Sequence, residues 1–191
     1  GIWRPVYLKA WNTARINAMS IVQKELSGKK AKVTAVFSID ASEALDATLN
    51  VSYGINGGSV KTNPLKIKLD KGMNEVSMDM DIENPLIWWP NGLGAHPVYT
   101  FTGSLNLQQT ELDRISTKTG LRTVKLVQKP ESDGGTSFYF EVNGVPVFAK
   151  GANYIPSDIF PSRVTDDHYR ELLKMAADAN MNMLRVWGGG I

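Results

Sequence analysis

Cysteine is absent from the sequence, and histidine occurs only as His96 and His168. The absence of cysteine excludes disulfides and thiolate chemistry. Catalytic zinc needs about three clustered protein ligands, and a chain with two histidines does not favour a multi-histidine site. We therefore expect no metal site, and no motif in the sequence calls for a cofactor.

Neither sign of charge dominates, because 21 basic and 19 acidic residues give a net charge of +2. The two signs are mixed along the chain, without the stripe of Lys and Arg that is typical of nucleic-acid or anionic-membrane binding. Apolar runs are also far shorter than the roughly 20 residues that span a bilayer. The sequence therefore predicts neither nucleic-acid binding nor membrane insertion.

From residue 14 to residue 122 the sequence shows the two-residue period of half-buried strands. The clearest apolar series is Ala31, Val33, Ala35, Phe37 and Ile39. The same alternation returns over residues 47–53, 65–69, 73–82 and 99–107, with turn signals such as Asn-Gly between the runs. About seven short strands without a helical pattern predict a mainly β fold, an immunoglobulin-like sandwich.

After residue 122 the pattern changes. Residues 138–150 predict a hairpin around an Asn143-Gly144 turn, and we expect a loop over residues 151–164. Residues 183–187 predict a further strand after an intervening helix.

The helix is indicated by its cap and its apolar stripe. Thr165 fits an N-cap, and Asp166 and Asp167 follow it where the helix dipole favours negative charge. Asn180 is expected to end the helix. One face carries the apolar residues Tyr169, Leu172, Leu173, Ala176 and Ala179.

A strand, a helix and a second strand form a βαβ unit, whose two strands are expected to be parallel. Both strands then end at the same edge of the sheet. In (β/α)8 barrels, which are built from repeated units of this type, that edge carries the active site. We expect five residues to converge there: Asn153, Tyr154, Asp158, Arg185 and Trp187. A single βαβ unit leaves its sheet edges uncovered, so we expect the protein to continue beyond residue 191.

Three segments, in order, resemble consecutive parts of one known family. Residues 1–6, Gly-Ile-Trp-Arg-Pro-Val, are similar to the last strand of the sugar-binding domain in glycoside hydrolase family 2. Residues 85–99, with Trp-Trp-Pro-Asn-Gly, resemble its immunoglobulin-like domain, and residues 140–156 resemble the entry to its catalytic barrel. The Trp-Trp-Pro-Asn-Gly, Lys-Gly-Ala-Asn-Tyr-Ile-Pro and Arg-Val-Trp-Gly-Gly-Gly forms look like the β-mannosidase branch.

The resemblance implies three domains and an enzymatic parent. Residues 1–13 would end the sugar-binding domain, residues 14–122 would form the sandwich, and residues 123–191 would begin a truncated (β/α)8 barrel. The family implies a retaining exo-glycosidase that removes terminal β-linked mannose from oligosaccharides, using two carboxylates about 5 Å apart. Both glutamates would lie beyond Ile191, so we expect an inactive fragment with no catalytic residue. The resemblance also favours a periplasmic or other extracytoplasmic compartment.

Candidate substrate-binding residues come from the same resemblance. Arg185 and Trp187 match positions that line the sugar subsite, where a guanidinium can bond hydroxyls and an indole can pack on a sugar ring. Alternatively, Trp187 is a barrel-core residue and Arg185 an ion-pair partner. Asn153 and Asp158 are expected in the loop at the same mouth, where they could instead shape the turn.

Three other features favour structural roles. The Asn74-Glu75 pair looks like the family's acid/base motif, but it lies at the start of a sandwich strand, where neither position nor surroundings suit a general acid. Trp88-Trp89 is expected to pack near the contact between sandwich and barrel rather than to form a sugar platform. His96, before a proline, is also expected to be structural.

Other interpretations remain open at this point. The chain could be a free-standing immunoglobulin-like carbohydrate-binding or adhesion module, although such a module has no use for an uncompleted barrel. The sugar could also be a β-galactoside or a β-glucuronide, since the family includes enzymes for both.

Overall fold

The computed structural model describes residues 2 and 5–189, which divide into two compact units. The first, here called the sandwich unit, contains residues 9–88 and 97–121. The second, here called the strand–helix unit, contains residues 89–96 together with the described residues up to Leu8 and from Arg122 onward.

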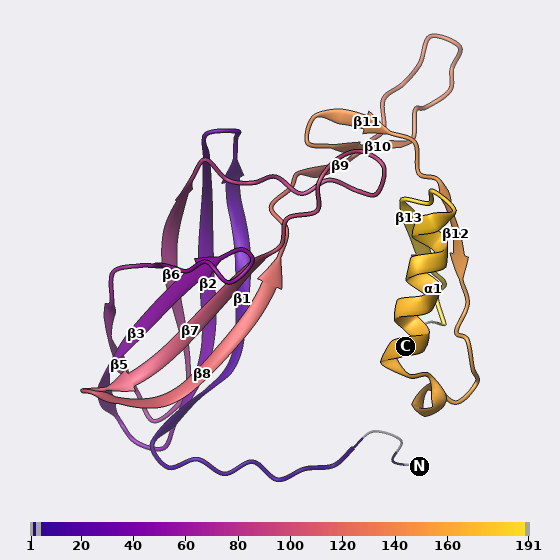
Figure 1. Ribbon diagram of the computed structural model, residues 1–191. Coiled ribbons are helices and arrows are strands. Elements are labelled where there is room, and N and C mark those ends of the chain that lie inside the picture. Colours follow the sequence, from indigo (N-terminus) through magenta and orange to yellow (C-terminus); the bar gives the residue numbers. More distant parts are fainter. Residues whose placement is uncertain (1, 3–4, 190–191) are drawn as a thin grey trace. The chain divides into compact units, whose positions relative to one another are not determined.

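Two antiparallel sheets face each other in the sandwich unit (Figure 1). One sheet has the order β1 (Ala14–Leu26), β2 (Lys30–Ala41) and β6 (Gly72–Glu83). The other has the order β4 (Val60–Lys61), β3 (Leu45–Gly54), β7 (Tyr99–Leu107) and β8 (Thr110–Thr119), and β5 (Leu65–Leu69) also pairs with β3. The prediction of a mainly β sandwich is confirmed.

The core lies between these sheets and contains the apolar series predicted for β2. Ala31, Val33, Ala35, Phe37 and Ile39 are each at most 1% exposed. The ring of Phe37 lies over Gly103 of the opposite sheet, where a Cβ would come within 2.4 Å of the ring carbon Cε1. Glycine at this position therefore lets the large aromatic side chain fit between the sheets at native density.

Strand β1 departs from regular pairing at two points. Its register against β2 shifts between Ile16 and Ala18 and again between Gln23 and Glu25. At the first shift the Ile16 N–H donates to Oδ2 of Asp113, on β8, at 2.7 Å. A carboxylate of one sheet thus satisfies a backbone donor of the other at a β-bulge.

Before β1, residues 5–13 have no regular secondary structure. The predicted last strand of a preceding domain falls in this region, and Gly1, Trp3 and Arg4 of its motif lie outside the described residues. That boundary stays a prediction.

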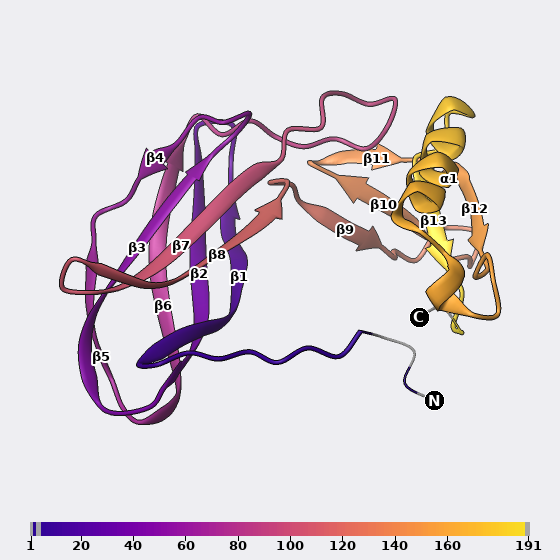
Figure 2. The same cartoon turned by 60° about the horizontal axis from the view of Figure 1, so that its bottom comes forward.

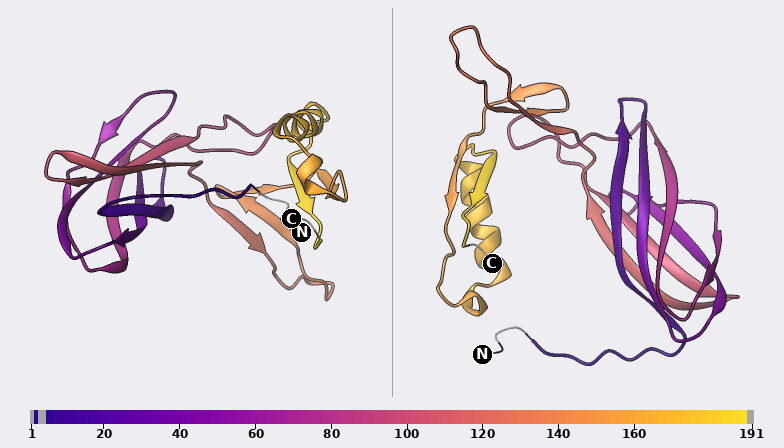
Figure 3. Two further views of the ribbon diagram at one scale, coloured as in Figure 1. Left: turned by 90° about the horizontal axis from the view of Figure 1, so that it is seen from below. Right: turned by 180° about the vertical axis from the view of Figure 1, so that it is seen from behind.

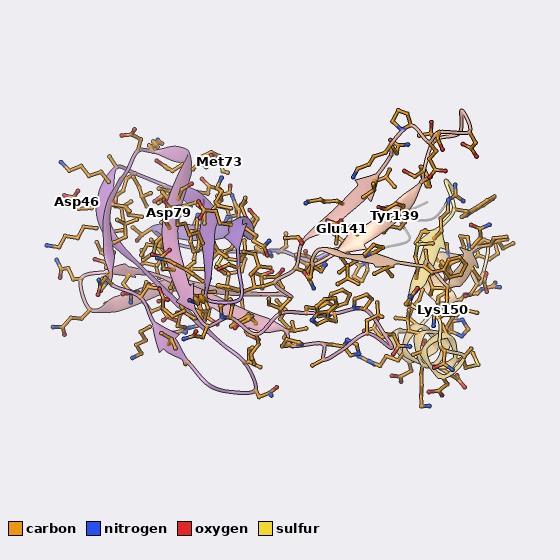
Figure 4. The ribbon with its side chains drawn as sticks, turned by 90° about the horizontal axis from the view of Figure 1, so that it is seen from above. Asp46, Met73, Asp79, Tyr139, Glu141 and Lys150 are labelled. Carbon is orange, nitrogen blue, oxygen red and sulfur yellow. The ribbon has the colours of Figure 1, made fainter. Side chains whose placement is uncertain are left out.

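In the strand–helix unit, an antiparallel sheet has the order β11 (Val145–Val147), β10 (Tyr139–Val142) and β9 (Val124–Val127). The predicted hairpin turn between β10 and β11 is confirmed, because Asn143 and Gly144 adopt φ of 52° and 80°. Both are left-handed values, which Asn and Gly tolerate best. Figure 4 shows the side chains of β10, with Tyr139 and Glu141 labelled.

The rest of this unit is a parallel βαβ arrangement, as predicted. Strand β12 (Gly151–Tyr154) pairs in parallel with β13 (Met183–Val186). Between them lie a short 3-10 helix, η1 (Pro161–Arg163), and α1 (Asp166–Asp178), which runs along the strand pair (Figure 2 and Figure 3).

The predicted ends of α1 are also confirmed. Oγ1 of Thr165 accepts the His168 N–H at 3.2 Å, which satisfies one of the free donors of the first turn. Asn180 takes φ of 58° directly after the last turn. Within the described residues, no helix is long and apolar enough to cross a bilayer.

One boundary was predicted incorrectly: residues 151–154 form β12, although the sequence favoured a loop there. Gly and Asn are poor strand formers, which hid the strand from pattern analysis. Glycine is needed at residue 151 because a Cβ would lie 1.8 Å from the carbonyl oxygen of Met183. Close approach of two backbones, rather than strand propensity, explains this residue.

The contact between Phe37 and Gly103 yields a prediction. Gly103→Ala should lower the free energy of unfolding of the sandwich unit by about 1–3 kcal/mol, because the added methyl group overpacks the core. Urea unfolding followed by circular dichroism measures the change. Gly28→Ala is the matched control, since a Cβ there meets nothing within 4 Å. Equal stability of the two variants would contradict the packing explanation.

Candidate functional site

The side chains of Asn153 and Arg185 lie together on one face of the parallel strand pair. The two residues are register partners, and Nη1 of Arg185 donates to Oδ1 of Asn153 at 3.2 Å. The next residue along β12, Tyr154, points to the other face, where its ring meets that of Tyr169 on α1 with centroids 6.4 Å apart. Since strand side chains alternate, Asn153 and Arg185 face away from the helix.

Trp187 continues this face beyond the end of β13. Its backbone N–H donates to the carbonyl of Tyr154 at 3.1 Å, so the parallel pairing extends by one more bond. Its position has the same parity as Arg185, and the residue is 45% exposed. Of the five residues expected to converge, the structure thus brings Asn153, Arg185 and Trp187 to the carboxyl end of the strand pair, with Asn153 on β12 rather than in a loop. The expectation was wrong for Tyr154, which follows Asn153 in the strand and therefore points to α1.

Asp158 has partners in its own loop. Oδ1 accepts the Phe160 N–H at 2.7 Å, and Oδ2 lies 3.9 Å from Nη1 of Arg163. These bonds shape the turn that leads into η1, which favours the structural alternative for this residue.

Chemically, the face holds donors and an indole rather than a reacting acid. A guanidinium has five N–H donors, and the bond to Asn153 uses only one of them. Planar donors beside an indole suit neutral hydroxyl-bearing ligands. Among residues 2 and 5–189, no three metal-ligating side chains gather in one place.

A small pocket on the helix side of the pair was not predicted from the sequence. Its walls are Tyr154, Pro156, Ser157, Asp158, Pro161, Val164, Tyr169 and Val186. The hydroxyls of Tyr154 and Ser157 lie 3.2 Å apart, and the Ser157 hydroxyl lowers the pKa of Tyr154 by bonding to its phenolic oxygen. The hydrogen bond with Tyr154 in turn raises the pKa of Tyr169. The three hydroxyls come from β12, the loop after it and α1, so no periodic sequence pattern signals that they meet.

Asn74-Glu75 builds a turn. Nδ2 of Asn74 donates to the carbonyls of Asp70 and Gly72 at 2.8 and 2.9 Å, and its Oδ1 accepts the Asp70 N–H at 2.9 Å. The pair lies on β6 of the sandwich unit. This placement favours the structural interpretation of the motif.

Trp88 and Trp89 belong to different units. The Trp88 N–H donates to the carbonyl of Leu121 at 2.9 Å, within the sandwich unit. The Trp89 N–H donates to the carbonyl of Ala95 at 2.9 Å, and the Trp89 carbonyl lies 2.5 Å from Nδ1 of His96. Both bonds fold the loop over residues 89–96, so the role of His96 here is structural.

Comparison with known proteins gives the family. The profile described as "Glycosyl hydrolases family 2" matches residues 14–122. The chain belongs to this family. The match covers the sandwich strands and the loop that contains Trp88 and Trp89.

Relatives of this family-2 chain include β-mannosidases. It is 34% identical over 194 residues to β-mannosidase B of Thermothelomyces thermophilus and 35% identical over 198 residues to β-mannosidase of Capra hircus. Each alignment covers 100% of this chain but 22% of the relative. The chain therefore corresponds to about a fifth of the length of these proteins.

Solved structures agree with this family assignment. The crystal structure of β-D-mannosidase from Dictyoglomus thermophilum matches with a TM-score of 0.90 and 34% identity, over 96% of this chain and 22% of that one. The exo-chitosanase of Amycolatopsis orientalis matches with a TM-score of 0.76 at 23% identity, over 94% of this chain and 20% of that one. The second likeness shows the fold alone.

The tyrosine pair yields a prediction about titration. Ser157→Ala should raise the pKa of Tyr154, because the phenolate loses the hydroxyl that stabilises its charge. NMR titration of the chain with 13C-labelled tyrosine rings follows each phenol separately, and loss of a signal in Tyr154→Phe assigns Tyr154. Ser132→Ala, in an exposed loop of the same unit, is the control and should leave the titration unchanged. A titration of Tyr154 that Ser157→Ala does not move would contradict the assigned bond.

Proposed function

We propose that this chain is part of a retaining exo-glycosidase that releases terminal β-linked mannose from oligosaccharides. In this proposal the immunoglobulin-like domain, residues 14–122, is a spacer and support, and residues 123–191 begin the catalytic (β/α)8 barrel. The described residues contribute to the sugar subsite, and the catalytic carboxylates lie in further chain.

The observation that carries the proposal is the face formed by Asn153, Arg185 and Trp187 on a parallel strand pair. In a (β/α)8 barrel the helices lie outside, so the face away from the helix is the interior. Side chains at the carboxyl ends of the strands then line the substrate site. The identity to β-mannosidases over the whole chain supports mannose as the sugar.

The roles follow from the chemistry of retaining hydrolysis. One carboxylate attacks the anomeric carbon while the other protonates the leaving oxygen, at a separation of about 5 Å. Arg185 and the indole of Trp187 would orient the terminal sugar so that its anomeric carbon meets the nucleophile. Asn153 would hold the guanidinium of Arg185 in place through the bond to its Oδ1.

The first prediction from this proposal concerns the 191-residue chain by itself. Purified, it should release no nitrophenol from nitrophenyl β-mannoside, because the proposal assigns it no nucleophile and no general acid. The longer enzyme should hydrolyse the same compound faster than the matching β-galactoside and β-glucuronide. Turnover by the 191-residue chain would overturn the proposed location of the carboxylates, and a preference for another glycoside would overturn the sugar.

The second prediction concerns Arg185 in the longer enzyme. Arg185→Ala should lower kcat/KM for the β-mannoside by about 10–100-fold, the value of a charge-assisted hydrogen bond to substrate. Arg185→Lys should lie between this variant and the wild type, since an ammonium keeps the charge but loses the planar donors.

Arg170→Ala is the matched control for Arg185→Ala. Arg170 is exposed on α1 and pairs with Asp167 at 2.7 Å, so its removal should leave kcat/KM unchanged. If the two alanine variants had equal effects on kcat/KM, Arg185 would not be a sugar-binding residue.

A further inference from the structure

Asn182 bonds the backbone where the strand pair begins. Its Nδ2 donates to the carbonyl of Phe148 at 3.1 Å, and its Oδ1 accepts the Lys150 N–H at 2.8 Å. Its backbone N–H donates to the carbonyl of Lys150 at 2.8 Å. Lys150, labelled in Figure 4, directly precedes β12. The residue just before β13 is thus fixed to the residues just before β12.

Asn91 fixes the neighbouring residue from a remote part of the sequence. Its Nδ2 donates to the carbonyls of Ala177 at 3.1 Å and Met181 at 3.0 Å. The Ala177 carbonyl, in the last turn of α1, also accepts the Asn180 N–H at 2.9 Å. Regular intrahelical bonds end in this turn, so a side-chain donor is favourable there. Because Met181 directly precedes Asn182, the two asparagines act on consecutive residues. Together we call Asn91 and Asn182 the register clamp.

The loop that presents Asn91 is itself held by bonds. The Leu93 N–H donates to the carbonyl of Pro90 at 3.1 Å, which closes a turn with Gly92 at φ of 79°. His96 and Ala95 bond the backbone of Trp89 on either side of this turn. Asn91 is therefore presented from an ordered loop, so little conformational entropy opposes its bonds.

Register decides which face of β13 carries Arg185 and Trp187. Strand side chains alternate, so a slip of one residue would turn both toward α1 and bring Leu184 to the opposite face. Only four register pairs hold β12 and β13 together in the described structure. A pairing this short gives weak register preference by itself.

We propose that Asn182 and Asn91 are positioning residues that set the register of β13 against β12, and thereby place Arg185 and Trp187 on the sugar-binding face. The proposal rests on the proposed function for the role of that face, but the register itself is measurable without any substrate. Neither asparagine touches the sugar in this scheme.

Engineered cysteines can report the register, because the chain has no cysteine of its own. Ala152→Cys with Leu184→Cys joins register partners, whose Cα separation of about 5 Å suits a disulfide. Ala152→Cys with Met183→Cys joins residues on opposite faces, which can bridge only after a one-residue slip. We expect the first pair to oxidise readily and the second pair to remain reduced.

The clamp is then weakened by Asn182→Asp and by Asn91→Asp. A carboxylate has the shape of the amide but no N–H to donate, and it is repelled by the carbonyls it faces. Each substitution should raise the ratio of slipped to in-register disulfide about tenfold, the value of the lost bonds. Asn56→Asp, in an exposed Asn-Gly turn of the sandwich unit, is the matched control and should leave the ratio unchanged.

The Asp variants also distinguish the register clamp from a role of Asn91 in shaping its own turn. If Asn91 only shaped the Pro90–Leu93 turn, Asp would replace it well, because Asp favours turns as much as Asn does. An unchanged disulfide ratio in both Asp variants would overturn the proposal. Asn182→Gln and Asn91→Gln, which keep the donor, should lie nearer the wild type, and they provide the test if an Asp variant fails to fold by circular dichroism.

Kinetics of the longer enzyme distinguish failure of the clamp from failure of the proposed function. If the Asp variants shift the register but the wild-type enzyme hydrolyses no β-mannoside, the sugar assignment fails and the clamp stands. If the wild-type enzyme is active and both disulfide ratios are unchanged, the clamp fails and the function stands.

Discussion

The backbones of β12 and β13 approach each other closely at Gly151, where the carbonyl of Met183 occupies the space that a side chain would fill. This contact starts the parallel pairing, and the register that follows places Asn153 opposite Arg185. The same alternation sends Tyr154 to α1, where it meets Tyr169. The face with the polar site and the face that holds the helix are therefore consequences of one pairing, and the site depends on a glycine that carries no chemistry.

The sandwich unit depends on a comparable fit between large and small residues. Phe37 fills the space that Gly103 leaves in the opposite sheet, and the carboxylate of Asp113 bonds a donor that the bulge in β1 exposes. One contact is apolar and central, and the other is polar and peripheral. Both join the two sheets directly, which the strand hydrogen bonds within each sheet cannot do.

Sequence analysis predicted the elements whose patterns are local. The alternation in β2, the Asn143-Gly144 turn and the Thr165 cap each depend on neighbouring residues, and each was correctly predicted. Strand β1 was not assigned individually because its two register shifts break the alternation. Strand β12 was not predicted because it begins with Gly151, a poor strand former. Glycine is needed there because the carbonyl of Met183, far away in the sequence, lies where a side chain would be.

The candidate site likewise has features that the sequence predicted and features that only the fold reveals. Parity alone put Arg185 and Trp187 on one face, since that is a local property. The bond from Arg185 to Asn153 required the parallel register, and the bond from Asn91 to Met181 joins residues 90 positions apart. Contacts between a side chain and a remote backbone carbonyl leave no periodic trace in a single sequence, so only the folded chain reveals them.

The path of the chain between the two units has a consequence for anyone who divides this protein. Residues 89–96 lie between β6 and β7 in the sequence, yet they group with the strand–helix unit. A continuous segment cut to isolate the sandwich therefore removes Asn91 from the end of α1, and the carbonyls of Ala177 and Met181 lose the bonds that its side chain donates. Dissection of the two units requires a short linker in place of this loop, with the loop itself left joined to its helix.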